Sequence, residues 1–181
     1  MNWWFKDRKK GVRVALMILL ALMAIFDAVL IYEAANPGEM SSGKSTAIGT
    51  VVAETINNIA ASFGEKQPPI TDMNSFLAFF RKLVGHYGAF LLLGIPSSFF
   101  FLIGFNNKSL MWSVPVNFVH GLFMAALTEF IQLFTPGRFG AWSDIGIDFA
   151  GYCTSSVIIS IVFVAIYLTR GRQTLPASKD C

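Results

Sequence analysis

Four long apolar runs most constrain what this chain can fold into. They cover about residues 12–34, 83–105, 110–134 and 144–168. A helix needs about 20 mostly apolar residues to cross a bilayer, and each run reaches that length. Charged residues make up only 14% of the 181 residues, whereas soluble domains carry about 25%. We therefore predict an all-α, polytopic integral membrane protein with four transmembrane helices, forming one domain over residues 1–181.

The segment between the first two runs has a different character. Thr46–Phe63 is weakly apolar and is interrupted by Glu54, Asn57 and Asn58. It is too polar to span the membrane, so we predict a short interfacial or re-entrant helix in the first outer loop. The second transmembrane helix should begin early, near Thr71–Asp72, because an aspartate there can cap its N-terminus.

The distribution of basic residues predicts the orientation. Four spans place both termini on one side, together with the loop that holds Lys108. That side carries nine Lys and Arg residues, and the other side carries five, namely Lys44, Lys66, Arg81, Lys82 and Arg138. Because cytoplasmic loops are enriched in Lys and Arg, we expect a multi-pass protein of the cell membrane with cytoplasmic N- and C-termini.

Polar residues gather where three predicted helices reach the outer side. The second run opens there, the third closes there, and the fourth opens there after the turn at Pro136 and Gly137. Ionisable groups this close to hydrocarbon are candidates for function by default. The candidates are Arg81, Lys82, His86, Glu129, Gln132, Arg138, Ser143, Asp144 and Asp148.

These residue types suggest two interpretations of the cluster. In the functional one, Arg138 binds a phosphate or carboxylate with its planar fork, and Glu129 or Asp144 acts as a base or orients the arginine. His86 is then a candidate general acid or base. In the structural one, the same charges form a salt-bridge network that pins the outer ends of the helices.

The stretch from Gly38 to Ser45 formally fits a phosphate-loop pattern. That loop needs a preceding strand and a parallel sheet, and no chain remains for a sheet. We therefore expect a polar outer loop and no nucleotide, although Ser41, Ser42, Ser45 and Lys44 can offer donors to an anion. The basic residues are spread over tails and loops without interleaved aromatic residues, so we expect no binding of nucleic acid.

Two ionisable residues, His120 and Asp27, lie inside the predicted spans and away from the outer cluster. A zinc site would need His86 and His120 at one depth with further ligands, so we expect no metal and no cofactor. Asp27 lies deep in the first span. It is either a proton-linked group or a bundle-facing partner for Asn117 or His120.

At the residues of the outer cluster, the chain resembles the VanZ-like family of membrane proteins. The pattern of that family combines a Ser-rich loop, a His at a helix entry, Glu-x-x-Gln, Pro-Gly-Arg and Ser followed by Asp. The matching residues here are Ser41, Ser42, Ser45, His86, Glu129, Gln132, Pro136, Gly137, Arg138, Ser143, Asp144 and Gly151. The resemblance covers most of residues 12–168.

The resemblance implies a part in glycopeptide resistance in Gram-positive bacteria, against teicoplanin-type drugs and lipoglycopeptides especially. The first hypothesis is an outward-facing polar site that binds or modifies a cell-wall lipid intermediate, or limits access of the drug to it. The second is a membrane enzyme acting on a lipid-linked phosphate or the stem peptide, with His86, Glu129 or Asp144 as catalytic groups. The third is a lipid transporter or flippase. The expected partners are membrane lipids and a lipid-linked cell-wall precursor or lipoglycopeptide.

Overall fold

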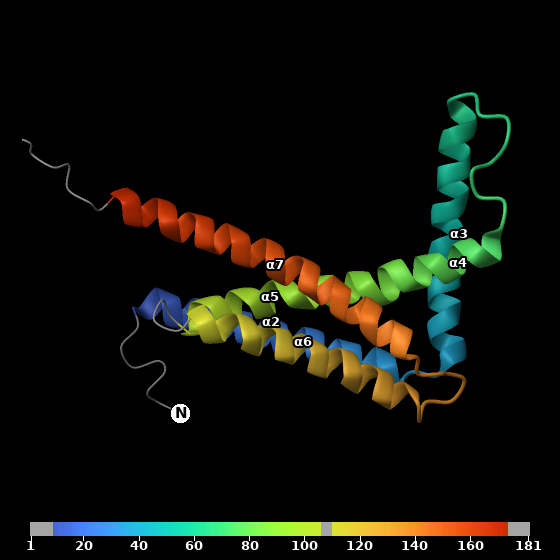
Figure 1. Ribbon diagram of the computed structural model, residues 1–181. Helices are drawn as coiled ribbons and strands as arrows, with labels where there is room; N and C mark the ends of the chain where they lie inside the picture. The colour runs from blue at the N-terminus through green and yellow to red at the C-terminus, as the bar shows by residue number, and fades with distance from the viewer. Residues whose placement is uncertain (1–8, 106–109, 174–181) are drawn as a thin grey trace, which may run out of the picture.

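The computed structural model describes residues 9–105 and 110–173, and within these ranges the chain is helical with no strand. Helices that run along one direction form the body of the molecule, and one long helix crosses their end (Figure 1). The elements are α2 (Lys10–Ala35), α3 (Gly38–Ser62), α4 (Met73–Phe80), the π-helix η1 (Arg81–Gly88), α5 (Ala89–Phe105), α6 (Leu110–Gln132) and α7 (Trp142–Gln173).

Four helices are long and apolar enough to cross a membrane, which confirms the predicted number of spans. They are Lys10–Ala35, Met73–Phe105, Met111–Gln132 and Trp142–Ile166. Helix α2 begins and α7 ends at the same end of the bundle, as four spans require (Figure 1). Which side of the membrane this end faces stays a prediction. Several basic residues behind that prediction, including Lys6, Arg8, Lys108 and Lys179, lie outside the described residues.

The bundle is apolar on the outside and partly polar within. Its buried core is formed by Phe90 and Leu93 of α5, Met124 and Ala125 of α6, and Tyr152 of α7. Many large apolar side chains point outward on all four spans, where lipid would surround them. Because lipid tails are as apolar as these side chains, close packing and interhelical hydrogen bonds must hold such helices together.

Close approach of α7 to the neighbouring helix depends on a small residue. A Cβ atom at Gly151 would lie 2.1 Å from the carbonyl oxygen of Tyr87, which no real Cβ tolerates. Gly146 of the same helix has no such role in packing. A Cβ at Gly146 would meet nothing within 4 Å.

Helix α3 is longer than the sequence predicted. We expected a short helix over Thr46–Phe63 after a polar loop, but the helix already begins at Gly38. Pro37 stands at its N-terminus, where proline is well tolerated, and Glu39 favours the first turn. Ser42 donates its hydroxyl to the Glu39 carbonyl oxygen, so the helix itself satisfies this serine.

α3 crosses the end of the bundle instead of running along the spans (Figure 1). Residues 38–45 belong to this helix and do not form a loop. The absence of nucleotide binding stays a prediction.

The second span is one continuous helical run that contains a π-helix. The Asp72 side chain accepts hydrogen bonds from the main-chain N–H groups of Asn74 and Ser75, which confirms the predicted cap. The hydrogen bonds from Ser75 lower the pKa of Asp72. The run then changes to π geometry at Arg81–Gly88 before α5 continues. π-helical turns are rare and are found frequently at functional sites.

The turn between α6 and α7 is fastened to the start of α3. The N–H of Gly38 donates to the carbonyl oxygen of Pro136 at 2.9 Å. Gly137 has a φ of 70°, in the left-handed region that favours glycine. A Cβ at Gly38 would lie 1.9 Å from the carbonyl oxygen of Gly137, so the close contact requires glycine. This contact brings α3 and the turn to one end of the bundle.

Candidate functional site

A polar cavity of about 190 Å³ lies between the helix ends on the α3 side of the bundle. Its walls come from α2, α3, η1, α5, α6, α7 and the turn before α7. The charged and hydroxyl-bearing side chains among its lining residues include Glu33, Ser41, Ser45, Arg81, His86, Arg138 and Asp148. Segments far apart in the sequence therefore converge on one small polar space, as the sequence predicted for one level of the bundle.

The π geometry of η1 explains how two of these groups come to share the cavity. Arg81 and His86 are five residues apart, and both line it. In an α-helix two such residues would point about 140° apart around the axis. A π-helix pairs residue i with residue i+5, which brings them toward a common face.

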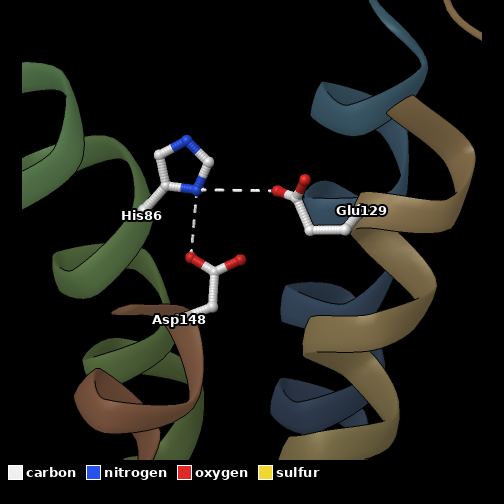
Figure 2. A group of neighbouring side chains, drawn as sticks. All are labelled: His86, Glu129 and Asp148. Carbon is white, nitrogen blue, oxygen red and sulfur yellow. Dashed lines mark hydrogen bonds and ion pairs between the residues drawn. The ribbon is translucent and has the colours of Figure 1, made fainter. Parts of the chain in front are cut away.

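The carboxylates of Glu129 and Asp148 face the same ring nitrogen of His86, as Figure 2 shows. Its Nδ1 atom lies 3.1 Å from Oδ1 of Asp148 and 4.0 Å from Oε1 of Glu129. Its Nε2 atom lies 4.0 Å from Oδ2 of Asp144. Asp148 is only 1% exposed and Glu129 only 3%. Three elements, η1, α6 and α7, thus supply one compact cluster of an imidazole and two carboxylates.

Main-chain and side-chain donors fix the carboxylate of Glu129. Its Oε2 atom accepts from the main-chain N–H of Ala141 at 2.9 Å, and its Oε1 atom accepts from Nε2 of Gln132 at 3.2 Å. Because Ala141 immediately precedes α7, Glu129 links the end of α6 to the start of α7. The carboxylate is held in place and presents Oε1 toward His86.

Asp144 forms a second, more exposed pair beside this cluster. Its Oδ1 atom accepts from Nζ of Lys82 at 2.9 Å and from the Ser143 hydroxyl at 3.1 Å. Lys82 therefore neutralises the aspartate nearest the surface. This leaves His86 as the partner of the two deeper carboxylates.

Arg138 does not bind the carboxylates that the sequence suggested would orient it. Its guanidinium donates to main-chain carbonyl oxygens at the end of α2: Nη2 to Glu33 at 2.8 Å and Nε to Asn36 at 3.2 Å. A cation at a helix C-terminus satisfies carbonyls that lack partners and complements the helix dipole. Burial lowers the pKa of Arg138, and the Glu33 carboxylate opposes that shift. Arg138 thus both caps α2 and lines the cavity.

Arg81 is the arginine that remains available. Within the described part of the chain its guanidinium has no hydrogen-bond or ion-pair partner, although Arg81 lines the cavity. The hydroxyl-bearing residues Ser41 and Ser45 line the same space from α3. Ser42, which the sequence proposed together with Ser45, is not among the lining residues.

A second polar cluster lies deeper in the bundle. His120 Nε2 is 3.3 Å from Oδ2 of Asp27, and His120 Nδ1 is 3.1 Å from the Tyr152 hydroxyl. Tyr152 in turn donates to Oδ1 of Asn117 at 2.6 Å. Of the alternatives given for Asp27, the structure shows a bundle-facing side chain with His120 as its partner. This chain of hydrogen bonds joins α2, α6 and α7.

An apolar groove of about 460 Å³ lies on a different face of α6. It is lined by residues such as Phe123, Phe130, Leu133 and Trp142, all largely exposed. The cavity is instead lined from α6 by Thr128 and Gln132. The groove therefore belongs to the surface that lipid would cover.

Most of the predicted site residues come together. The cavity is lined by six of them, namely Ser45, Arg81, His86, Gln132, Arg138 and Asp148. Glu129 contacts Gln132 and lies near His86. The adjoining ion pair of Lys82 and Asp144 also includes the Ser143 hydroxyl. Glu33 and Thr128, which the sequence did not propose as ligands, also line the cavity. The position of Glu33 near the C-terminal end of the first span was the available signal.

This arrangement allows two kinds of chemistry. The two arginines and the Ser41 hydroxyl can hold an anionic oxygen group, because guanidinium donors match phosphate and carboxylate geometry. The His86, Glu129 and Asp148 cluster can accept or donate protons, or offer one nitrogen and two oxygen ligands to a cation.

Comparison with known proteins identifies the family. No curated protein and no solved structure matches the chain significantly. The model of the VanZ/LLP1 family matches residues 14–163, which include every residue of the cavity and all four spans except the first turn of the first and the last turn of the fourth. The chain therefore belongs to the VanZ/LLP1 family and is a multi-span membrane protein linked, at the level of that family, to glycopeptide resistance.

Proposed function

We propose that the cavity binds the phosphate or carboxylate of a lipid-linked cell-wall intermediate at the outer face of the cell membrane. By holding or altering this lipid, the protein limits access of lipid-bearing glycopeptides such as teicoplanin in a Gram-positive host. Family membership supports the link to glycopeptide resistance. The position of the cavity at the helix ends supports a ligand whose head group lies at the membrane surface.

One observation carries this proposal: Arg81 lines the cavity without a partner among the described residues. Arg81 is an exposed residue, so its guanidinium is open to an anion that reaches the cavity from the membrane surface. Arg138 and Ser41 line the same space and supply further donors, whereas the Ser45 hydroxyl donates to main-chain carbonyls of α3. An anion with several oxygens would satisfy these donors together, and a lipid anchor would deliver it to this level.

The cluster around His86 favours catalysis as a second candidate function. Asp148 lies within hydrogen-bond distance of Nδ1, an arrangement that orients an imidazole as a general base or acid. A phosphate held by Arg81 would lie in the cavity that His86 also lines. Hydrolysis or group transfer on that lipid-linked phosphate is therefore the reaction class to test if binding is shown.

Direct binding of a polyprenyl phosphate tests the proposal. The purified protein in lipid nanodiscs is titrated with the polyprenyl phosphate, and Arg81→Gln is compared with wild type. Loss of a charge-assisted hydrogen bond of about 1.5–3 kcal/mol predicts roughly 10- to 100-fold weaker binding. Lys66→Gln is the matched control, because it removes one exposed positive charge outside the cavity. Equal affinity of wild type and Arg81→Gln would contradict the proposal.

A further inference from the structure

We propose that His86, Glu129 and Asp148 form a binding site for one divalent transition-metal ion in the wall of the cavity. Figure 2 shows the three side chains converging from different elements. Their ligand atoms, one from each residue, all lie within 4.8 Å of one another. Across the described ranges no other group of three or more His, Cys, Asp or Glu residues meets this condition.

The distances suit a common ion after small side-chain adjustments. Nitrogen and oxygen ligands at about 2.0–2.2 Å from one ion stand roughly 3–3.5 Å apart in tetrahedral or octahedral geometry. The pair of His86 Nδ1 and Asp148 Oδ1 already has this separation at 3.1 Å. The pair of His86 Nδ1 and Glu129 Oε1, at 4.0 Å, needs to close by less than about 1 Å. Rotation about the glutamate side-chain bonds can supply that movement.

The surroundings of Glu129 resemble the outer support that metal ligands usually have. Ligating carboxylates are themselves hydrogen-bonded, and these outer partners fix their orientation. The Ala141 N–H holds Oε2 and the Gln132 amide contacts Oε1. Glu129 is therefore held with one oxygen already directed at the common position.

Charge provides an independent argument. Glu129 and Asp148 are both buried, and a pair of buried carboxylates close together is unfavourable without positive charge. Lys82 is engaged with Asp144, and Arg138 donates to main-chain carbonyls of α2. His86 alone can supply at most one positive charge. A divalent ion would balance both carboxylates and leave the imidazole neutral, as a ligand must be.

The ligand types indicate the class of ion. An imidazole favours Zn²⁺ over Mg²⁺ and Ca²⁺, while two carboxylates suit Mn²⁺ and are also found as ligands of Zn²⁺. Three protein ligands leave coordination positions for water or another ligand. An open coordination position could meet the phosphate held by Arg81, and this step rests on the proposed function. The metal site itself does not depend on the proposed function.

The deeper histidine provides a matched comparison within the same protein. His120 also pairs with a carboxylate, Asp27, at 3.3 Å, but its other nitrogen lies 3.1 Å from the Tyr152 hydroxyl. Only one carboxylate reaches it among the residues that the structure describes. The sequence led us to expect no metal because it compared the two histidines, whereas the proposed site combines one histidine with two acids.

The test uses the metal alone, without lipid. Untagged full-length protein is stripped with a chelator, incubated with Zn²⁺ or Mn²⁺, desalted and analysed by elemental mass spectrometry. We expect about one ion per chain for at least one of the two metals, and a metal-dependent rise in melting temperature. Less than about a tenth of an ion per wild-type chain for both metals would overturn the proposal whatever any variant does.

Isosteric variants then locate the ion. Asp148→Asn and Glu129→Gln should weaken binding of the metal at least about tenfold, while the matched control Asp27→Asn, which alters the deeper histidine cluster, should keep wild-type affinity. Size-exclusion profiles and melting without metal identify variants that fail to fold. Retained binding in both folded ligand variants, or loss in the control Asp27→Asn, would contradict the assignment.

The metal site and the lipid site can fail separately. If Arg81→Gln loses the polyprenyl phosphate but keeps the metal, both proposals stand. If the wild-type protein binds the metal but does not bind the polyprenyl phosphate, only the proposed function is overturned. Phosphate binding by a wild-type protein that takes up neither metal would overturn only the metal site.

Discussion

The guanidinium of Arg138 donates to the main-chain carbonyl oxygen of Glu33 at 2.8 Å, across 105 residues of sequence. Together with the bond to the Asn36 carbonyl, this contact ties the turn before α7 to the C-terminus of α2. The residue that the sequence marks most clearly as an anion clamp is thus also part of the architecture. Tests of function have to separate the two roles.

The first prediction concerns this dual role. Arg138→Lys keeps the charge but loses the two-point fork, and Arg138→Ala loses both. We expect either change to lower stability by about 1–3 kcal/mol, because carbonyls at the end of α2 lose donors. Arg81→Gln should leave stability near wild type. Melting temperatures in detergent measure the difference, and an unchanged temperature for Arg138→Ala would show that the cap is dispensable.

The second prediction concerns orientation. Lys66 lies between α3 and α4, and the basic-residue distribution places it outside. A cysteine introduced there, in a background without Cys153 and Cys181, should react with an impermeant thiol reagent on intact cells. A cysteine at Lys10, at the opposite end, should react only after lysis. The reverse labelling pattern would place the cavity on the cytoplasmic side.

The third prediction concerns resistance. Expression in a susceptible Gram-positive host should raise the inhibitory concentration of teicoplanin-type drugs more than that of vancomycin, which has no lipid tail. Arg81→Gln should remove this difference at normal expression levels, because the cavity loses its unpaired cation. Lys66→Gln should not. Equal protection against both drugs, or protection that survives Arg81→Gln, would exclude the proposed mechanism.

The fourth prediction compares two glycines of α7 that differ only in their surroundings. Gly151→Ala should destabilise by about 1–3 kcal/mol, because the added Cβ would collide with the Tyr87 carbonyl. Gly146→Ala has open space and should be neutral or stabilising by up to about 1 kcal/mol. Similar melting temperatures for the two variants would show that α7 does not pack against η1 as described.

The spans could be predicted because length and apolarity alone decide whether a helix can cross a bilayer. The cap at Asp72 could also be predicted, and the contact of Asp27 with His120 was one of the alternatives that the sequence offered. The early start of α3 at Gly38 could not be predicted from the sequence. Glycine and serine are weak helix formers, and a contact with the distant turn at Gly137 supports that end of the helix.

The convergence of His86, Glu129 and Asp148 on one point was only partly predictable. Their common level followed from the spans, but side-chain directions depend on how η1, α6 and α7 rotate against one another. The partners of Arg138 were beyond prediction for another reason. They are main-chain carbonyls, and any residue type could have supplied them.

The π-helix also governs how this chain can be compared with its relatives. A relative that lacks one residue within 81–88 could form an ordinary α-helix there, and everything before the deletion would turn by about 100° relative to α5. Arg81 would then leave the cavity although the letter in the sequence is unchanged. Alignments that place such a gap outside η1 would equate residues that face different surroundings. The register of this one segment decides which basic residue of a relative corresponds to Arg81.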